Sequence, residues 1–168
     1  MVYSGKREIN NIMIIIRKAK IKDVPQVAKL GADLLRLHAK FDKYFIPIKN
    51  IEKFYNKFFK ASVYSSESLL LAAEKDKKIV GYMLAVIRKR ESVYKLQKVG
   101  NINDGYIIPP YRRQGITSEF IKKSFQWFKI KKIKNVELQV HIKNPIGRAA
   151  WSKYGFETYV EQRRLKIK

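Results

Sequence analysis

The chain has 168 residues with 46% hydrophobic and 12% aromatic residues, which excludes wholesale disorder and predicts one domain with a buried core. It has 37 Lys and Arg against 14 Asp and Glu, so its net charge of +23 favours polyanionic partners and repels cationic ones at long range. The absence of cysteine excludes disulfides, zinc–thiolate sites and a cysteine nucleophile. No apolar run approaches the roughly 20 residues of a membrane span, so we expect a cytoplasmic protein with no membrane span and no bound metal.

The N-terminal part predicts a strand followed by a helix. Residues 1–11 are polar and lack a pattern, so we expect a flexible extension there, followed by one domain over residues 12–168. An apolar run over residues 13–17 begins the first strand. Asp23 is expected to be the N-cap of the first helix, because Pro25 follows just inside it and apolar residues then recur at helical spacing.

Polar turns and changes of apolar period divide the rest of the chain. Alternating or continuous apolar runs indicate strands, and an apolar rhythm close to the helical period indicates helices. The central strand is expected to be kinked at Gly105, where a glycine interrupts it. The elements expected after the first helix are a helix over 48–60, strands over 69–74, 78–88 and 99–108, a helix over 113–130, a strand over 135–141, a helix over 145–154 and a last strand over 156–167. This order predicts an α/β fold with a mixed (α+β) sheet.

The segment over residues 106–117 predicts a phosphate-binding turn. It is a strand that turns through Gly115 into a helix. Such a turn leaves unpaired backbone N–H groups at the helix N-terminus, where the helix dipole adds partial positive charge. An anion, and a phosphate above all, is the ligand that this arrangement favours.

Two motifs resemble those of the GNAT N-acetyltransferase superfamily. Arg112-x-x-Gly115-x-Thr117 resembles the motif Q/R-x-x-G-x-G/A, which holds the pyrophosphate of acetyl-CoA, with Thr117 in place of the preferred small residue. The segment Asn144-x-x-Gly147-x-x-x-Trp151-x-x-x-Gly155-Phe156 is similar to the family's Asn-x-x-Ala-x-x-x-Tyr-x-x-x-Gly-Phe. The resemblance implies a mostly antiparallel mixed sheet of roughly six or seven strands, splayed between strands four and five and flanked by about four helices.

The resemblance also implies acetyl-CoA as co-substrate. Pantetheine would bond to the backbone of the central strand, the pyrophosphate would bind the turn, and the loop after the fifth strand would supply an asparagine. The residues that it assigns to acetyl-CoA are Tyr106, Ile107, Ile108, Arg112, Arg113, Gln114, Gly115, Ile116, Thr117, Asn144 and Trp151.

The catalytic groups follow from the same resemblance. Trp151 stands where the family often has a tyrosine that protonates the CoA thiolate, and an indole N–H gives up no proton, so Tyr154 is the substitute acid. The attacking amine must be neutral, which requires a base. Asp104 is the first choice, two residues before the pantetheine-binding stretch, because a cleft there would raise its pKa. The alternative bases are Glu74, Glu137 and His141.

The implied activity is acetyl transfer from acetyl-CoA to a primary amine by direct attack in a ternary complex. The acceptor is a protein N-terminus, a lysine or a small molecule. In this fold the first two helices wall the acceptor site, so Tyr44, Phe45, Tyr55 and Phe59 would line it, although helically spaced aromatic residues equally describe a core. The alternative is a catalytically weak, basic module that binds acyl-CoA or nucleic acid. The sequence leaves monomer and homodimer open.

Overall fold

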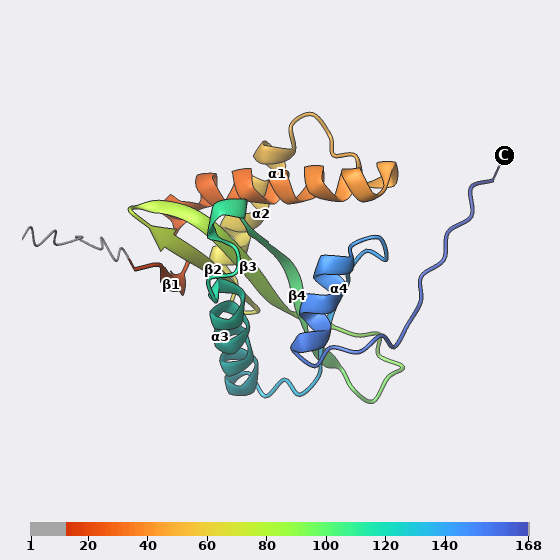
Figure 1. Cartoon of the computed structure of the whole chain (residues 1–168). Coiled ribbons are helices and arrows are strands. Elements are labelled where there is room, and N and C mark those ends of the chain that lie inside the picture. The colour runs from red at the N-terminus through yellow and green to blue at the C-terminus, as the bar shows by residue number, and fades with distance from the viewer. Residues whose placement is uncertain (1–12, 168) are drawn as a thin grey trace, which may run out of the picture.

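The computed structural model describes residues 13–167, which form one mixed sheet with helices on both of its faces (Figure 1). The expected extension over residues 1–11 lies outside the described residues. The strand order is β1-β2-β3-β4-β5, with antiparallel neighbours except for the parallel pair β4 and β5. The strands are β1 (Ile15–Lys18), β2 (Ser68–Lys75), β3 (Lys78–Lys89), β4 (Lys98–Ile107) and β5 (Val136–Leu138). None of the described helices is long and apolar enough to cross a bilayer.

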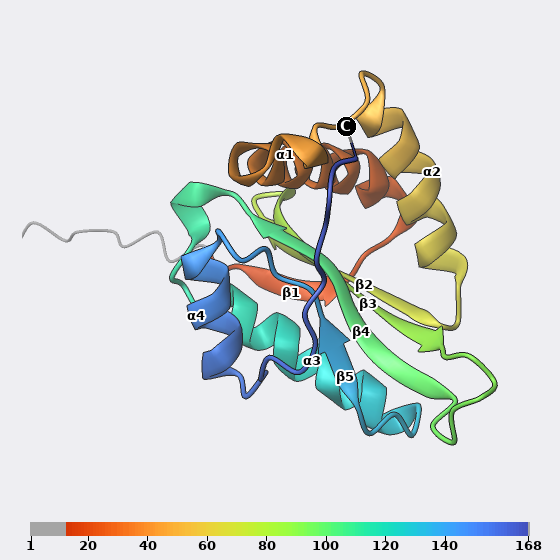
Figure 2. The same ribbon diagram turned by 90° about the vertical axis from the view of Figure 1, so that its right-hand side faces the viewer.

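Four α-helices cover the sheet, as expected. The first two pack on one face and the last two on the other (Figure 2). They are α1 (Val24–Phe41), α2 (Ile51–Tyr64), α3 (Ile116–Ile130) and α4 (Pro145–Lys153), with short 3-10 turns η1 (Ile21–Asp23), η2 (Lys43–Phe45) and η3 (Pro109–Tyr111). β2 and β3 read as continuous apolar runs because both of their faces are buried.

The expected splay between strands four and five is confirmed. β5 pairs with β4 only where Val136–Leu138 lies beside residues 100–102. Beyond Ile102 the strand β4 runs on to Ile107 without a β5 partner in the described sheet. The carboxyl ends of the parallel pair therefore diverge.

A last strand over residues 156–167 was a wrong prediction. Within the described part of the chain this segment has neither helix nor strand, and the sheet has five strands rather than six or seven. Val160, Leu165 and Ile167 are all strongly exposed, so the segment offers no apolar face for burial. Without burial, ladder hydrogen bonds to the short β5 do not offset the cost of ordering the chain.

The irregularity of β4 that was expected at Gly105 is a β-bulge two residues earlier, at Asn103. The pairing of β3 with β4 shifts between Leu84–Asp104 and Ala85–Ile102, which leaves Asn103 as the extra residue of a β-bulge. The extra residue reverses the faces: Ile102 packs into the core under α3, whereas Tyr106, four positions on, packs into the core under α1 and α2.

Asp23 is the N-cap residue of α1, as predicted, but its side chain makes no capping hydrogen bond. Its carboxylate accepts instead from Arg17 Nη1 at 2.6 Å and from the backbone N–H of Lys20 at 2.7 Å. Arg17 also donates to Glu74 Oε2 at 2.7 Å through Nε. The guanidinium thus holds both carboxylates, and the pair ties β1, β2 and the start of α1 together.

Candidate functional site

The turn between β4 and α3 has the backbone conformation that a phosphate seat requires. Gly115 is the N-cap of α3 and has a left-handed φ of 79°, and Arg113 has a φ of 61°. A Cβ built on Gly115 would meet no atom within 4 Å, so the space before it is open. A cavity of about 240 Å³ begins there and reaches Ile16 of β1. A side chain is disfavoured at Gly115 by φ rather than by a neighbour.

The first amides of α3 point into this open space. The first backbone bond of the helix runs from Glu119 N–H to Gly115 O at 3.1 Å. The N–H groups of Ile116, Thr117 and Ser118 precede it and have no acceptor within residues 13–167. Ile116 is buried under the helix and fixes the turn, so the amides are held in place for an anion.

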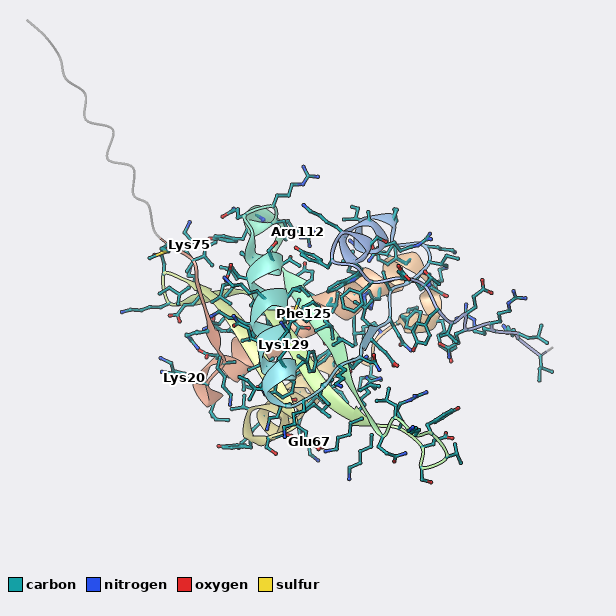
Figure 3. All side chains as sticks on the ribbon, turned by 90° about the horizontal axis from the view of Figure 1, so that it is seen from below. Lys20, Glu67, Lys75, Arg112, Phe125 and Lys129 are labelled. Carbon is teal, nitrogen blue, oxygen red and sulfur yellow. The ribbon has the colours of Figure 1, made fainter. Side chains whose placement is uncertain are left out.

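The two arginines of the turn differ in their contacts, since Arg112 bonds to the backbone and Arg113 does not. Arg112 Nε donates to Ile107 O at 2.8 Å, and the guanidinium lies 5.4 Å from the centroid of the Tyr106 ring. Arg113 is exposed and makes no ion pair within the described chain. Gln114 Nε2 donates to Pro110 O at 3.0 Å. Figure 3 shows Arg112 beside the start of α3, with Lys129 further along that helix.

Of the expected pantetheine-binding stretch, Ile107 presents its backbone to the open edge of β4. The N–H of Ile108 donates to Val80 O at 3.0 Å in the ladder with β3. Backbone groups alternate between the two edges of a strand, so those of Ile107 face away from β3. Its carbonyl already accepts from Arg112, which leaves its N–H for a ligand. The roles of Tyr106 and Ile108 in binding stay predictions.

Asn144 caps the last helix. Its Oδ1 accepts from the N–H of Gly147 at 2.9 Å, and a Cβ on Gly147 would lie 2.6 Å from Asn144 Nδ2. A side chain at Gly147 would therefore require the Asn144 side chain to move from its capping position. At the other end of α4, Gly155 has a φ of 85°, the left-handed conformation in which helices commonly end.

Tyr154 and Trp151 lie on the α3 side of the sheet. The Tyr154 hydroxyl shares a hydrogen bond of 2.8 Å with Ser118 Oγ in the first turn of α3. The Trp151 ring is half-buried and packs edge-on against Phe156 at a centroid distance of 5.6 Å. The predicted acid thus lies beside the phosphate seat, on the opposite side of the sheet from Asp104.

Asp104 is half-buried among tyrosines on the α1 and α2 side. Burial raises its pKa to about 6, although the nearby hydroxyls of Tyr82 and Tyr55 and the N–H of Gly105 all favour the charged form. The Tyr82 hydroxyl is fully buried and has no hydrogen-bond partner of good geometry among the described residues. Its pKa is raised by burial and by the charge of Asp104. Sequence reasoning missed Tyr82 as a neighbour of Asp104, because this tyrosine lies within the apolar run of β3.

The alternative bases are engaged elsewhere. Glu74 is paired with Arg17 at 2.6 Å, and Glu137 lies near Tyr159, whose pKa burial and Glu137 raise. His141 Nδ1 accepts from the N–H of Lys143 at 3.0 Å, and its ring stacks on Phe41 at a centroid distance of 6.1 Å. Asp104 makes no ion pair within residues 13–167 and is the candidate carboxylate whose pKa burial raises.

An aromatic group joins the end of α1 to the segment after β5. The Phe45 ring lies edge-on to both His141, at 5.7 Å, and His38, at 6.4 Å. Burial and the neighbouring His141 lower the pKa of His38. Tyr55 and Phe59, also expected at the acceptor wall, are buried in the core, whereas Tyr44 and Phe45 are exposed.

The splayed sheet, the amide-lined turn and the isolated carboxylate are the features of an acyltransferase that uses CoA. The chain belongs to the acetyltransferase (GNAT) family, whose model matches residues 34–156. A comparison with curated proteins gives no significant match.

Solved structures share the fold at low sequence identity. A mutant of the BH1408 protein from Bacillus halodurans superposes with a TM-score of 0.80 at 22% identity, covering 92% of this chain and 99% of that one. A predicted acetyltransferase with acetyl-CoA from Clostridium acetobutylicum gives 0.72 at 22% identity, covering 92% and 96%. An aminoglycoside antibiotic 6'-N-acetyltransferase from Acinetobacter haemolyticus gives 0.70 at 18% identity, covering 92% and 98%.

Proposed function

We propose that this chain is an N-acetyltransferase that transfers the acetyl group of acetyl-CoA to a primary amine in a ternary complex. The observation that carries the proposal is the seat at Gly115, where the first backbone N–H groups of α3 are unpaired within residues 13–167 beside open space. The amine acceptor is further supported by the names of similar structures, which include aminoglycoside N-acetyltransferases.

The residues present fit the phosphate end of acetyl-CoA. The amides of Ile116 and Thr117 offer donors to the pyrophosphate, and the exposed Arg113 adds a charge. The N–H of Ile107 lies on the open edge of β4, where an extended pantetheine arm would add as a further strand. Thr117 is half-buried, and its backbone N–H has no acceptor within the described residues.

Asp104 is the proposed base. Acetyl-CoA supplies a thioester, and the amine must lose a proton before it attacks the carbonyl carbon. A carboxylate with a pKa of about 6 is ionised at neutral pH and is a better proton acceptor than an ordinary aspartate. Its two tyrosine neighbours, Tyr82 and Tyr55, favour the charged form of the carboxylate.

The proposed acid is Tyr154 or water. The Tyr154 hydroxyl is held by Ser118 next to the phosphate seat. Trp151 packs against Phe156, and its indole N–H is too weakly acidic to protonate a thiolate. Since a thiolate is a good leaving group, water serves if Tyr154 does not.

A thiol-release assay with acetyl-CoA and a panel of primary amines tests the proposal. We expect CoA release that depends on the amine. The alternative, a basic module without catalysis, is favoured by the net charge of +23 alone. It predicts acyl-CoA binding without release, and nucleic-acid binding that weakens steeply with salt. Binding without release for every amine would remove the enzyme proposal.

A further inference from the structure

The carboxylate of Asp42, just after α1, holds a cation from the far end of the chain. Its Oδ2 accepts from Arg164 Nη2 at 2.7 Å. The same guanidinium lies 4.4 Å from the centroid of the Tyr44 ring. A planar cation thus has a carboxylate at its edge and an aromatic ring at its face, which is the arrangement that guanidinium groups prefer.

This cation seat, defined as Asp42 and Tyr44, is built without help from Arg164. Asp42 Oδ1 accepts from the N–H of Tyr44 at 2.9 Å, so one turn fixes both the carboxylate and the ring. The Tyr44 ring is braced edge-on by Phe45 at a centroid distance of 5.5 Å. The Tyr44 N–H is also the largest cause of the lowered pKa of Asp42, ahead of Arg164. The seat therefore stays anionic when the arginine leaves.

The seat lies where the two halves of the proposed active site meet. His141 Nε2 is 3.7 Å from Asp42 Oδ2, and the His141 ring stacks on Phe41 of α1. His141 belongs to the segment between β5 and α4, which also carries Asn144. Asp42 thus joins the connection between α1 and α2 to the carboxyl end of the parallel strand pair, where the strands diverge.

The segment that delivers Arg164 is held loosely. Residues 157–167 have no regular structure and extend away from the sheet, on the side of the fold where α1 ends (Figure 1). Leu165 is 86% exposed, and the neighbouring Arg163 is 89% exposed and pairs only with Glu161 within the described chain. Arg164 itself is 52% exposed, against 20% for Asp42. An exposed arginine on a preformed seat is easily displaced.

We propose that the seat recognises a guanidinium carried by the amine acceptor, and that Arg164 is its intramolecular competitor. The proposal rests on the proposed function, because it names the acceptor class of the same site. The net charge of +23 repels a cationic acceptor at a distance. At the seat the local field is set by Asp42 instead, since neighbouring charges dominate within a Debye length.

Calorimetric titration with agmatine, which carries a primary amine and a guanidinium, tests the seat without any turnover. We expect Arg164→Ala to bind agmatine about fivefold more tightly than the wild type, because the competitor is gone. Arg163→Ala is the matched control and should bind like the wild type. n-Butylamine, which has the amine alone, should bind weakly and equally to all of these proteins.

Two further variants, made in the Arg164→Ala protein, test whether the gain in agmatine affinity arises at the cation seat. Asp42→Asn and Tyr44→Ala should each return agmatine affinity to the wild-type level or below, with melting temperatures showing that both proteins are folded. Equal affinities of the Arg164→Ala and Arg163→Ala proteins would overturn the proposal, and so would undiminished binding in the Asp42→Asn variant. Agmatine binding without acetyl transfer would instead count against the proposed function and leave the seat standing.

Discussion

The Tyr154 hydroxyl and Ser118 Oγ share a hydrogen bond of 2.8 Å that fastens the end of α4 to the first turn of α3. Both residues lie in segments that the family resemblance assigns to acetyl-CoA, yet the bond itself follows from neither motif. It places a phenol beside the amides that face the open space at Gly115. This contact braces the phosphate seat, and the acid role proposed for Tyr154 is a second, separate role.

Substitution of Tyr154 separates these two roles. If Tyr154 is the acid, Tyr154→Phe should lower the single-turnover rate of acetyl transfer by about two orders of magnitude or more at saturating acetyl-CoA. If water protonates the thiolate, the rate should fall only modestly. Ser118→Ala removes the same bond but keeps the phenol, so it is the matched control.

Trp151 stands at the position of the family's usual acid, and its replacement tests whether that geometry is retained. Trp151→Tyr should restore or raise the rate of acetyl transfer, measured in single turnovers and in the Tyr154→Phe background as well. The Trp151 ring packs against Phe156, so a smaller ring also costs some stability. Neutral results for both Trp151→Tyr and Tyr154→Phe would show that neither position supplies the acid.

Gly155 provides a matched control for a substitution of Gly115 in the phosphate seat. Gly115 and Gly155 both have left-handed φ, 79° and 85°, and a Cβ on either would meet no atom within 4 Å. Gly115→Val and Gly155→Val should therefore strain the backbone alike. Only Gly115→Val should abolish the rise in melting temperature that millimolar acetyl-CoA gives the wild type. Equal stabilisation of both variants would place the phosphate seat elsewhere.

The cap at Asn144 predicts a coupling between two substitutions. Gly147→Ala restores the residue of the family motif, but its Cβ would lie 2.6 Å from Asn144 Nδ2, so we expect a loss of about 1 kcal/mol through the broken cap. Asn144→Ala should cost a similar amount. The double variant should lose clearly less than the sum, because the cap is lost only once. Denaturant unfolding measures all of them, and strict additivity would contradict the shared cap.

The order of helices and strands could be predicted from local sequence patterns, because the spacing of apolar residues in a segment indicates which of its faces is buried. Strands 69–74 and 78–88 were expected from continuous apolar runs and appear as β2 and β3. The last strand was not predicted correctly, since its residues carry strand-like composition but no face of the fold covers them. Whether a segment forms a strand depends on a neighbouring strand to pair with and a face to pack against. The composition of the segment itself carries no information about that neighbour.

The site could be predicted only in part, for a similar reason. The turn at Gly115 was predicted because its conformation depends on the residues of the turn itself. The tyrosine neighbours of Asp104 were not, because the bulge at Asn103 decides which face of β4 the carboxylate takes. The contact between Asp42 and Arg164 joins residues that are 122 positions apart, and no local signal marks either one.

The raised pKa of Asp104 makes opposite predictions for stability and for activity. Its folded-state pKa of about 6 lies above the ordinary aspartate pKa of 3.8, so the folded protein binds more protons than the unfolded one between these values. The free energy of unfolding should therefore fall as pH rises from about 4 to 6 and then stay level. Asp104→Asn removes this penalty and should stabilise the protein by about 1–3 kcal/mol at pH 8, measured by urea unfolding.

Acetyl transfer should respond in the reverse sense. With Asp104 as base, kcat/KM should rise with pH through an apparent pKa of about 6, which gives the pH profile an ascending limb. Asp104→Asn should abolish this limb and lower the rate by at least about two orders of magnitude. Tyr82→Phe is the matched test of positioning. It removes a hydroxyl that favours the charged carboxylate, so the limb should move to higher pH while much of the rate is kept. An Asp104→Asn enzyme with an unchanged pH profile would exclude Asp104 as the base.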